Sequence, residues 1–190
     1  DNPEISKVGI KKIFLKPGAK ASKKAVQKIL EADMVIIGPG NYYCSLIPNL
    51  LVEGIPEAIV KSKAKVVLNC NLVNKKGHTE KFFLEDYVNS INKYLGRERI
   101  NFVTFNTRKP SSSLIKKYED KKELLVSINN DNDSNKKYKI IKSGFLSEKK
   151  PSYSQSDILA DRRAFIRHDS DRLAKVLMKI IKGMVIHPVE

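Results

Sequence analysis

The sequence predicts an α/β fold built on a parallel sheet, and two observations predict it. Short, almost wholly apolar runs, residues 33–37 (DMVII) and 64–68 (AKVVL), are typical of strands buried on both faces of a parallel sheet. Stretches with helical periodicity separate these runs, which indicates repeated strand–helix–strand units. A chain of 190 residues suffices for one substantial domain, so we expect a single unit over residues 1–190.

The first elements are predicted to alternate between strand and helix. Residues 8–14 (VGIKKIF) are predicted to form a strand. Ser22 can cap the next helix, because its hydroxyl can accept a hydrogen bond from a free amide of the first turn. The apolar residues of that helix fall on one face: Ala25, Val26, Ile29 and Leu30. Residues 33–37 then form the second strand.

The middle of the chain continues this alternation. Residues 45–52 are predicted to form one or two helical turns around Pro48, and Pro56 opens a second helix that ends near Ser62. Residues 64–68 follow as a buried strand.

The next unit has a longer helix. Residues 84–95 carry apolar side chains at helical spacing, and Gly96 is a typical stop signal after them. Residues 100–105 (INFVTF) supply the following strand.

The later part of the sequence is less regular. Residues 111–118 are predicted to form a short helix, and residues 123–128 and 138–141 are predicted strands. The polar tract 129–137 between those strands is predicted to be a surface turn, and residues 147–156 a loop.

The last helix is the clearest, and it should pack on the sheet. Asp169 or Ser170 is placed to cap its amino end. An apolar stripe at a period of 3.6 residues marks its buried face: Leu173, Val176, Leu177, Ile180, Ile181 and Met184.

Composition narrows the function classes. The formal net charge is +15, but the lysines occur as scattered pairs, without the interleaved aromatic residues of single-strand binding proteins. This pattern argues against a nucleic-acid partner, and a basic nucleic-acid-binding module remains only as an alternative.

The apolar runs are far shorter than the roughly 20 residues of a membrane span, so we expect no membrane association and a cytoplasmic protein. Two cysteines, Cys44 and Cys70, are too few for a disulfide framework.

Ligands of open α/β sheets lie beyond the carboxyl ends of the strands, so the residues after each strand are candidates. Gly38 and Gly40 follow the strand 33–37 and allow a sharp turn with close approach of the backbone to a ligand. The hydroxyl of Ser45 and the first amides of the next helix could then receive an anion. Alternatively, the G-P-G turn only reverses the strand.

Two asparagines follow the strand 64–68. The amide of Asn71 suits a ribose, a sugar hydroxyl or a base edge, whereas Asn69 or Asn71 could equally form a turn with its own backbone. His78 lies in the polar loop that follows, and it is given no role.

A third candidate precedes the last helix. Arg167 is the usual type of residue for a phosphate and stands beside the helix amino end, although it could instead pair with Asp169 or Asp171. His168 could act as a general base or only as a cap partner. The sequence contains no recognisable catalytic triad, cluster of metal ligands or pair of catalytic carboxylates.

Four segments together resemble a known family. Residues 32–52 (ADMVIIGPGNYYCSLIPNLLV) resemble the A-D-x-I-x-x-G-P-G-S-L-Y-T-S-I-x-P-N-L-L-V signature of the 2-phospho-L-lactate transferase (CofD) superfamily, especially its gluconeogenesis factor (YvcK) branch. Residues 70–79 are similar to its C-N-L-x-T-Q-x-G-E-T loop, residues 85–88 to its A-D-H-V helix start, and residues 166–174 to its I-R-H-D-x-x-K-L-A motif.

The resemblance implies a three-layer, Rossmann-like fold with a mostly parallel sheet, helices on both faces and a nucleotide-diphosphate ligand. For the gluconeogenesis factor branch the ligand is a nucleotide sugar, UDP-N-acetylglucosamine, and the role is regulation of carbon metabolism, cell-wall synthesis and cell shape. The alternative is 2-phospho-L-lactate transfer to a deazaflavin in coenzyme F420 biosynthesis, so whether the protein is an enzyme stays open. A divalent metal bound with the diphosphate and a homodimer also stay open.

The resemblance assigns ligand binding to residues at matched positions: Gly38, Gly40, Asn41, Ser45, Asn49, Asn71, Arg167 and His168. Asn41 and Cys44 depart from the Ser and Thr of the family signature, and His78 replaces a Glu. The Gly-rich phosphate turn that opens family members is also missing. We therefore expect the chain to be the carboxy-terminal part of a longer protein.

Overall fold

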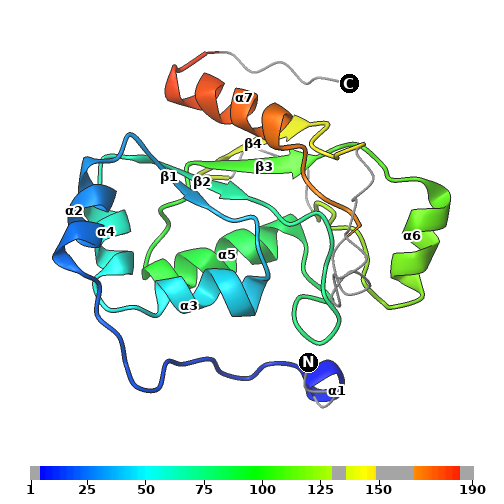
Figure 1. Ribbon diagram of the computed structural model, residues 1–190, viewed down its shortest axis with the longest axis horizontal. Coiled ribbons are helices and arrows are strands. Elements are labelled where there is room, and N and C mark those ends of the chain that lie inside the picture. Colours follow the sequence, from blue (N-terminus) through cyan, green and yellow to red (C-terminus); the bar gives the residue numbers. More distant parts are fainter. Residues whose placement is uncertain (1–4, 130–135, 149–164, 185–190) are drawn as a thin grey trace, which may run out of the picture.

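The computed structural model describes residues 5–129, 136–148 and 165–184. Its centre is a four-stranded sheet with the order β1-β2-β3-β4, in which every pair of neighbours runs parallel (Figure 1). The strands are β1 Met34–Ile37, β2 Lys65–Asn69, β3 Phe102–Asn106 and β4 Lys139–Ser143. This parallel sheet confirms the predicted α/β class.

Helical segments precede, connect and follow the strands. They are α1 Ile5–Val8, α2 Lys23–Glu31, the π-helix η1 Tyr42–Leu46, α3 Ile47–Leu50, α4 Ile55–Lys61, α5 Leu84–Leu95, α6 Ser112–Glu119 and α7 Ser170–Ile181. α5 has the predicted bounds, and Gly96 ends it in the left-handed conformation at φ 77°. The Ser22 hydroxyl accepts a hydrogen bond from the Ala25 amide at 3.2 Å, which confirms the predicted cap of α2.

The sheet is covered on both faces (Figure 1). α3 and α5 lie on one face, where the larger core gathers around Val66, Leu68 and the buried side of α5. α7 lies on the other face, over Val67 and Ile141. Val66 and Leu68 thus point to one face and Val67 to the other, as the alternation of side chains along a strand requires. The three-layer arrangement is confirmed.

Two predicted strands are wrong. Residues 8–14 do not form a strand: α1 ends at Val8, and Gly9 takes a positive φ of 74°. Ile13 packs against the larger core, but Val8 and Phe14 are 84% and 65% exposed, so this segment has little apolar surface to hold it in a sheet.

Residues 123–128 likewise form no regular strand, only an isolated bridge between Leu125 and Val73. Their backbone bonds go to neighbouring loops instead: the Asn74 amide donates to Leu124 O at 2.8 Å, and the Leu84 amide donates to Ser127 O at 2.9 Å. Most of the predicted turn 129–137 and of the predicted loop 147–156 lies outside the described residues.

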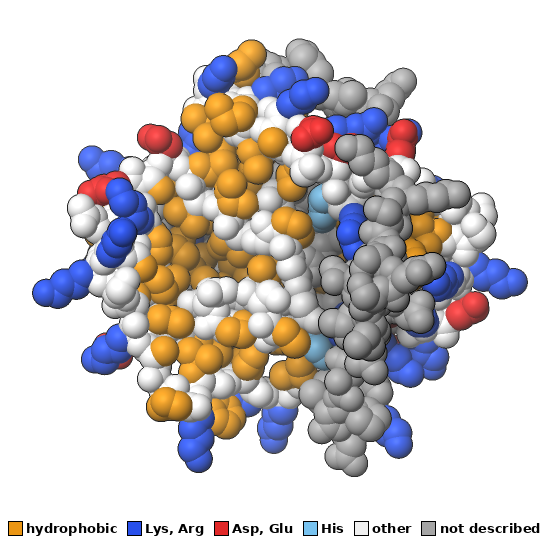
Figure 2. All heavy atoms as spheres, viewed as in Figure 1, with side chains coloured by type: hydrophobic (Ala, Val, Ile, Leu, Met, Phe, Trp, Pro, Cys, Tyr) orange, Lys and Arg blue, Asp and Glu red, His pale blue; other side chains and the backbone are white. Residues whose placement is uncertain are grey.

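Figure 2 shows how surface side chains are distributed on one face of the molecule. Lysine and arginine side chains stand around the rim of the face in Figure 2, and hydrophobic side chains gather nearer its middle. Among the exposed apolar residues are Ile36 of the edge strand β1, 48% exposed, and Met178 of α7, 49% exposed. No helix among the described residues is long and apolar enough to cross a membrane.

Candidate functional site

The turn after β1 is shaped by two glycines. Gly38 has a φ of 79°, and a Cβ atom there would lie 3.1 Å from the carbonyl oxygen of Asn69. A Cβ atom on Gly40 would lie 3.1 Å from a methyl carbon of Leu46. Position 38 therefore needs glycine for its backbone conformation and its close approach to the end of β2, and at Gly40 the side chain of Leu46 leaves little room for a Cβ atom.

Two asparagines after β2 hold this turn in place. Asn69 donates from Nδ2 to Gly38 O at 3.2 Å, and Asn71 donates from Nδ2 to Gly40 O at 3.0 Å. The Asn69 Oδ1 atom also accepts from the Thr104 hydroxyl on β3 at 3.1 Å. Asn71 therefore braces the neighbouring turn instead of forming a turn with its own backbone.

Contrary to the sequence prediction, Ser45 does not stand at a helix start. The helical segment begins three residues earlier, at Tyr42, and the Ser45 amide donates to Asn41 O at 2.7 Å within it. Ser45 is exposed, and so is Asn49, whose Nδ2 donates to Ser45 O at 2.6 Å. Asn41 is the residue at the amino end, and its side chain makes no cap hydrogen bond.

The loop after β2 is fixed by a buried polar contact. Asn74 is 5% exposed; its Oδ1 accepts from the Tyr87 hydroxyl at 2.8 Å, and its Nδ2 donates to Phe82 O at 2.8 Å. The Thr79 hydroxyl, 1% exposed, accepts from the Lys75 amide at 3.0 Å. Because buried polar groups need partners, these contacts select one conformation of the loop.

Residues 165–168 form the opposite wall, which we call the strap. The hydroxyl oxygen of Tyr118, at the end of α6, accepts from the amides of Phe165 at 2.9 Å and Ile166 at 3.3 Å. On the other edge of the strap, the Ser147 amide donates to Arg167 O at 2.9 Å. The strap is thus bonded to α6 on one side and to the segment after β4 on the other.

These segments enclose one hollow of about 910 Å³ beyond the carboxyl ends of the strands. It is lined by Pro39, Gly40, Asn41, Tyr42, Asn71, Leu72, Val73, Asn74, Lys75, His78, Thr79, Tyr118, Lys121, Glu123, Phe165, Ile166, Arg167 and His168. Its volume is in the range of small-molecule sites.

Five of the eight residues predicted to bind ligand line the hollow: Gly40, Asn41, Asn71, Arg167 and His168. The other three are Gly38, Ser45 and Asn49. Gly38 does not line the hollow, but it gives the turn after β1 its shape.

The lining carries more positive than negative charge. Lys75, Lys121 and Arg167 supply three cations, and Glu123 is the only carboxylate among the described lining residues. Sequence reasoning missed Lys121, Tyr118 and Glu123, because they come from α6 and the turn after it, which carries no motif. Asp169 forms a salt bridge with Arg172 at 3.8 Å.

Two histidines in the hollow are held neutral. Burial lowers the pKa of His168 to about 4, although a hydrogen bond to the Cys70 backbone opposes this shift. Burial, and then the charge of Lys75, lowers the pKa of His78. His168 is not the cap of α7, because the side chain of Asp169 accepts from the Arg172 amide at 2.9 Å. In the described part of the chain, no three His, Cys, Asp or Glu side chains gather as a metal site.

Comparisons with known proteins agree with this architecture. Residues 2–146 match the family model of 2-phospho-L-lactate transferase CofD. A protein of Clostridium acetobutylicum named "putative gluconeogenesis factor" is 36% identical over 173 residues, which are 90% of this chain and 36% of that protein. A protein of the same name from Aquifex aeolicus is 30% identical over 93% of this chain and 50% of its own length.

A solved structure is similar as well. The crystal structure of a UPF0052 family member from Bacillus halodurans matches with a TM-score of 0.76 and 28% identity, over 92% of this chain and 53% of that chain. The chain thus spans about a third to a half of the relatives' length. The chain belongs to the 2-phospho-L-lactate transferase CofD family, and its similar relatives include proteins named as gluconeogenesis factors.

Proposed function

We propose that the hollow binds a nucleotide sugar, UDP-N-acetylglucosamine, and that the protein is a cytoplasmic regulator of the gluconeogenesis factor type, acting on carbon metabolism, cell-wall synthesis and cell shape. One observation carries the proposal: segments after β1, after β2 and before α7 line a single hollow that has three cations and one carboxylate. A diphosphate has the complementary charge, and the names of the relatives point to the same type of protein.

Each wall has a part in this proposal. Lys75, Lys121 and Arg167 hold the diphosphate. They replace Ser45, the residue expected from the sequence, because Ser45 does not line the hollow. Asn71 uses its Nδ2 to hold the turn, so its Oδ1 is the atom offered to a ribose or sugar hydroxyl. The proposal includes a divalent metal bound chiefly through the diphosphate, with Glu123 as the nearby carboxylate. A homodimer is compatible with the proposal but forms no part of its argument.

Calorimetric titration of the full-length protein with UDP-N-acetylglucosamine tests this function. The Arg167→Ala variant should bind tenfold to a hundredfold more weakly, because a hydrogen bond to a charged group contributes about 1.5–3 kcal/mol. Arg97→Ala is the matched control, since Arg97 is exposed and lies outside the hollow. Absence of heat with the unmodified protein, or equal affinities of both variants, would overturn the proposal.

A second candidate is transfer of 2-phospho-L-lactate to a deazaflavin, which the matched family model favours. If the protein has this activity, product should form only when the deazaflavin and the guanosine-diphosphate-activated donor are supplied together. Mass spectrometry of that mixture, with each substrate omitted in turn, separates a transferase from a binding protein.

A further inference from the structure

A second groove lies at the opposite edge of the sheet, where the strands begin. Its volume is about 850 Å³, and three segments that are distant in the sequence line it: residues 62–65, 99–102 and 136–139. Six cations line it, with no carboxylate among the described lining residues: Lys63, Lys65, Arg99, Lys136, Lys137 and Lys139. We call this feature the basic groove.

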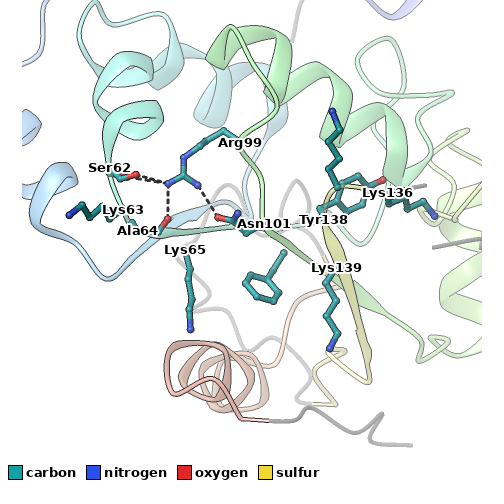
Figure 3. A pocket seen from close by; sticks show the side chains of 11 residues that line it. Ser62, Lys63, Ala64, Lys65, Arg99, Asn101, Lys136, Tyr138 and Lys139 are labelled. Atoms are coloured by element: carbon teal, nitrogen blue, oxygen red, sulfur yellow. Dashed lines mark hydrogen bonds between the residues drawn. The ribbon is translucent and has the colours of Figure 1, made fainter. Parts of the chain in front are cut away.

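Two of these cations are fixed by carbonyl oxygens, and Figure 3 shows the bonds of one of them, Arg99. Arg99 donates to Ser62 O at 2.9 Å and to Ala64 O at 2.7 Å. Lys65 donates to the carbonyls of Ile180 and Ile181, the last residues of α7, at 2.6 and 3.0 Å. Carbonyl partners orient these side chains and, unlike carboxylates, bring no full negative charge to them.

The remaining charge of the basic groove is clearly positive. Glu85 pairs with Lys136 at 3.4 Å, and Glu98 pairs with Lys137. The carboxyl ends of two helices, α4 and α7, each contribute about half a negative charge near Arg99 and Lys65. Among the described residues, these negative charges together offset about three of the six cations. Lys63 and Lys139 are exposed, and no described carboxylate pairs with either.

Aromatic rings line the same groove. Phe102 and Tyr138 are both partly buried there: Phe102 packs against the core on the α7 face of the sheet, and Tyr138 against the core on the α5 face. Phe102 is the direct neighbour of Lys139 in the β3–β4 register. In Figure 3, Lys139 and Lys65 extend toward α7, and Tyr138 lies between Lys136 and Lys139 along the chain. Sequence reasoning found no interleaving of aromatic and basic residues, because the interleaving exists only in space, across three segments.

We propose that the basic groove binds single-stranded nucleic acid. Its cations would contact successive phosphates, while Phe102 and Tyr138 offer ring faces on which bases can stack. The site is separate from the hollow, which lies beyond the other ends of the same strands, so either proposal can fail without the other.

Fluorescence anisotropy with a labelled 12-residue oligothymidylate tests the proposal on the full-length protein. About three uncompensated cations predict that log K falls with log[salt] at a slope of about −2. In the double variant Lys63→Gln, Lys139→Gln the slope should become about −0.7, with at least about tenfold weaker binding at 0.05 M salt. Both lysines are exposed, so the fold should persist, which circular dichroism can verify.

The control is the double variant Lys11→Gln, Lys12→Gln, which removes the same charge from exposed residues outside the groove. It should bind like the unmodified protein, and equal weakening of the two variants would overturn the proposal. Inorganic polyphosphate with the same number of phosphates should compete at least about fivefold more weakly, because it cannot stack. Equal competition would overturn the assignment to nucleic acid.

Discussion

Single side chains set the geometry of the hollow by accepting or donating a few backbone hydrogen bonds. Asn71 fixes the G-P-G turn through Gly40, and Tyr118 fixes the strap through Phe165 and Ile166. Each of these bonds joins segments more than 30 residues apart in the sequence. The site is therefore preorganised by a small number of polar contacts, which makes it sensitive to single substitutions.

At this scale, Tyr118→Phe should weaken the strap. The variant keeps the buried ring, which is 8% exposed, but removes the acceptor of two backbone amides. We expect the free energy of unfolding to fall by about 1–3 kcal/mol, measured by urea denaturation, because a buried donor without a partner costs about this much. Tyr94→Phe is the control, since Tyr94 lies outside the hollow. Equal stabilities of the two variants would contradict the clamp described for Tyr118.

At the scale of elements, α7 closes one face of the sheet and carries the strap at its amino end. Its buried side chains Leu173, Val176 and Ile180 pack with Val67 and Ile141. The apolar stripe predicted this packing, and the cap is Asp169, one of the two residues predicted for that role. Arg167 and His168 directly precede the cap of α7, so the position of this helix determines theirs.

The cap of α7 gives a quantitative prediction. Asp169→Ala removes the acceptor of the Arg172 amide and should lower the free energy of unfolding by about 0.5–2 kcal/mol. Asp169→Asn keeps an acceptor at a position where Asn and Asp are nearly equivalent, so its loss should be clearly smaller. Urea denaturation of both variants measures the difference, and equal losses would mean that charge, rather than the cap hydrogen bond, determines the effect.

At the scale of the whole molecule, stability should depend on pH through the partly buried histidines of the hollow. His168 has a pKa of about 4 in the folded protein, against about 6.5 in the unfolded chain. Between these values the unfolded state binds the extra proton, so the free energy of unfolding falls as the pH falls from about 6.5 toward 4. The pKa of His78 is also lowered, so it contributes in the same direction.

Urea denaturation between pH 6.5 and 5 checks this dependence. One such histidine contributes a slope of at most about 1.4 kcal/mol per pH unit. His168→Gln should remove most of that slope while keeping a side chain that can donate to the Cys70 backbone. An unchanged slope in the variant would show that His168 is not the group that titrates.

The sequence by itself determined the strands β1 to β4, the bounds of α5 and the caps of α2 and α7. These features depend on apolar runs, helical periodicity and capping residues, which are local. It also predicted five residues that share the hollow, since the carboxyl ends of parallel strands meet at one edge. Residues 8–14 and 123–128 were predicted wrongly, because an alternating or apolar run forms a strand only when a neighbouring strand pairs with it.

Only the tertiary structure decided which side chains complete each site. Lys121 and Glu123 enter the hollow because α6 packs beside the strap, and the basic groove exists because three distant segments begin or end at one edge of the sheet. The tertiary structure also places Ser45 outside the hollow. The helical segment starts at Tyr42, and Ser45 is exposed. Such placements depend on packing between elements, which the local pattern of residues does not encode.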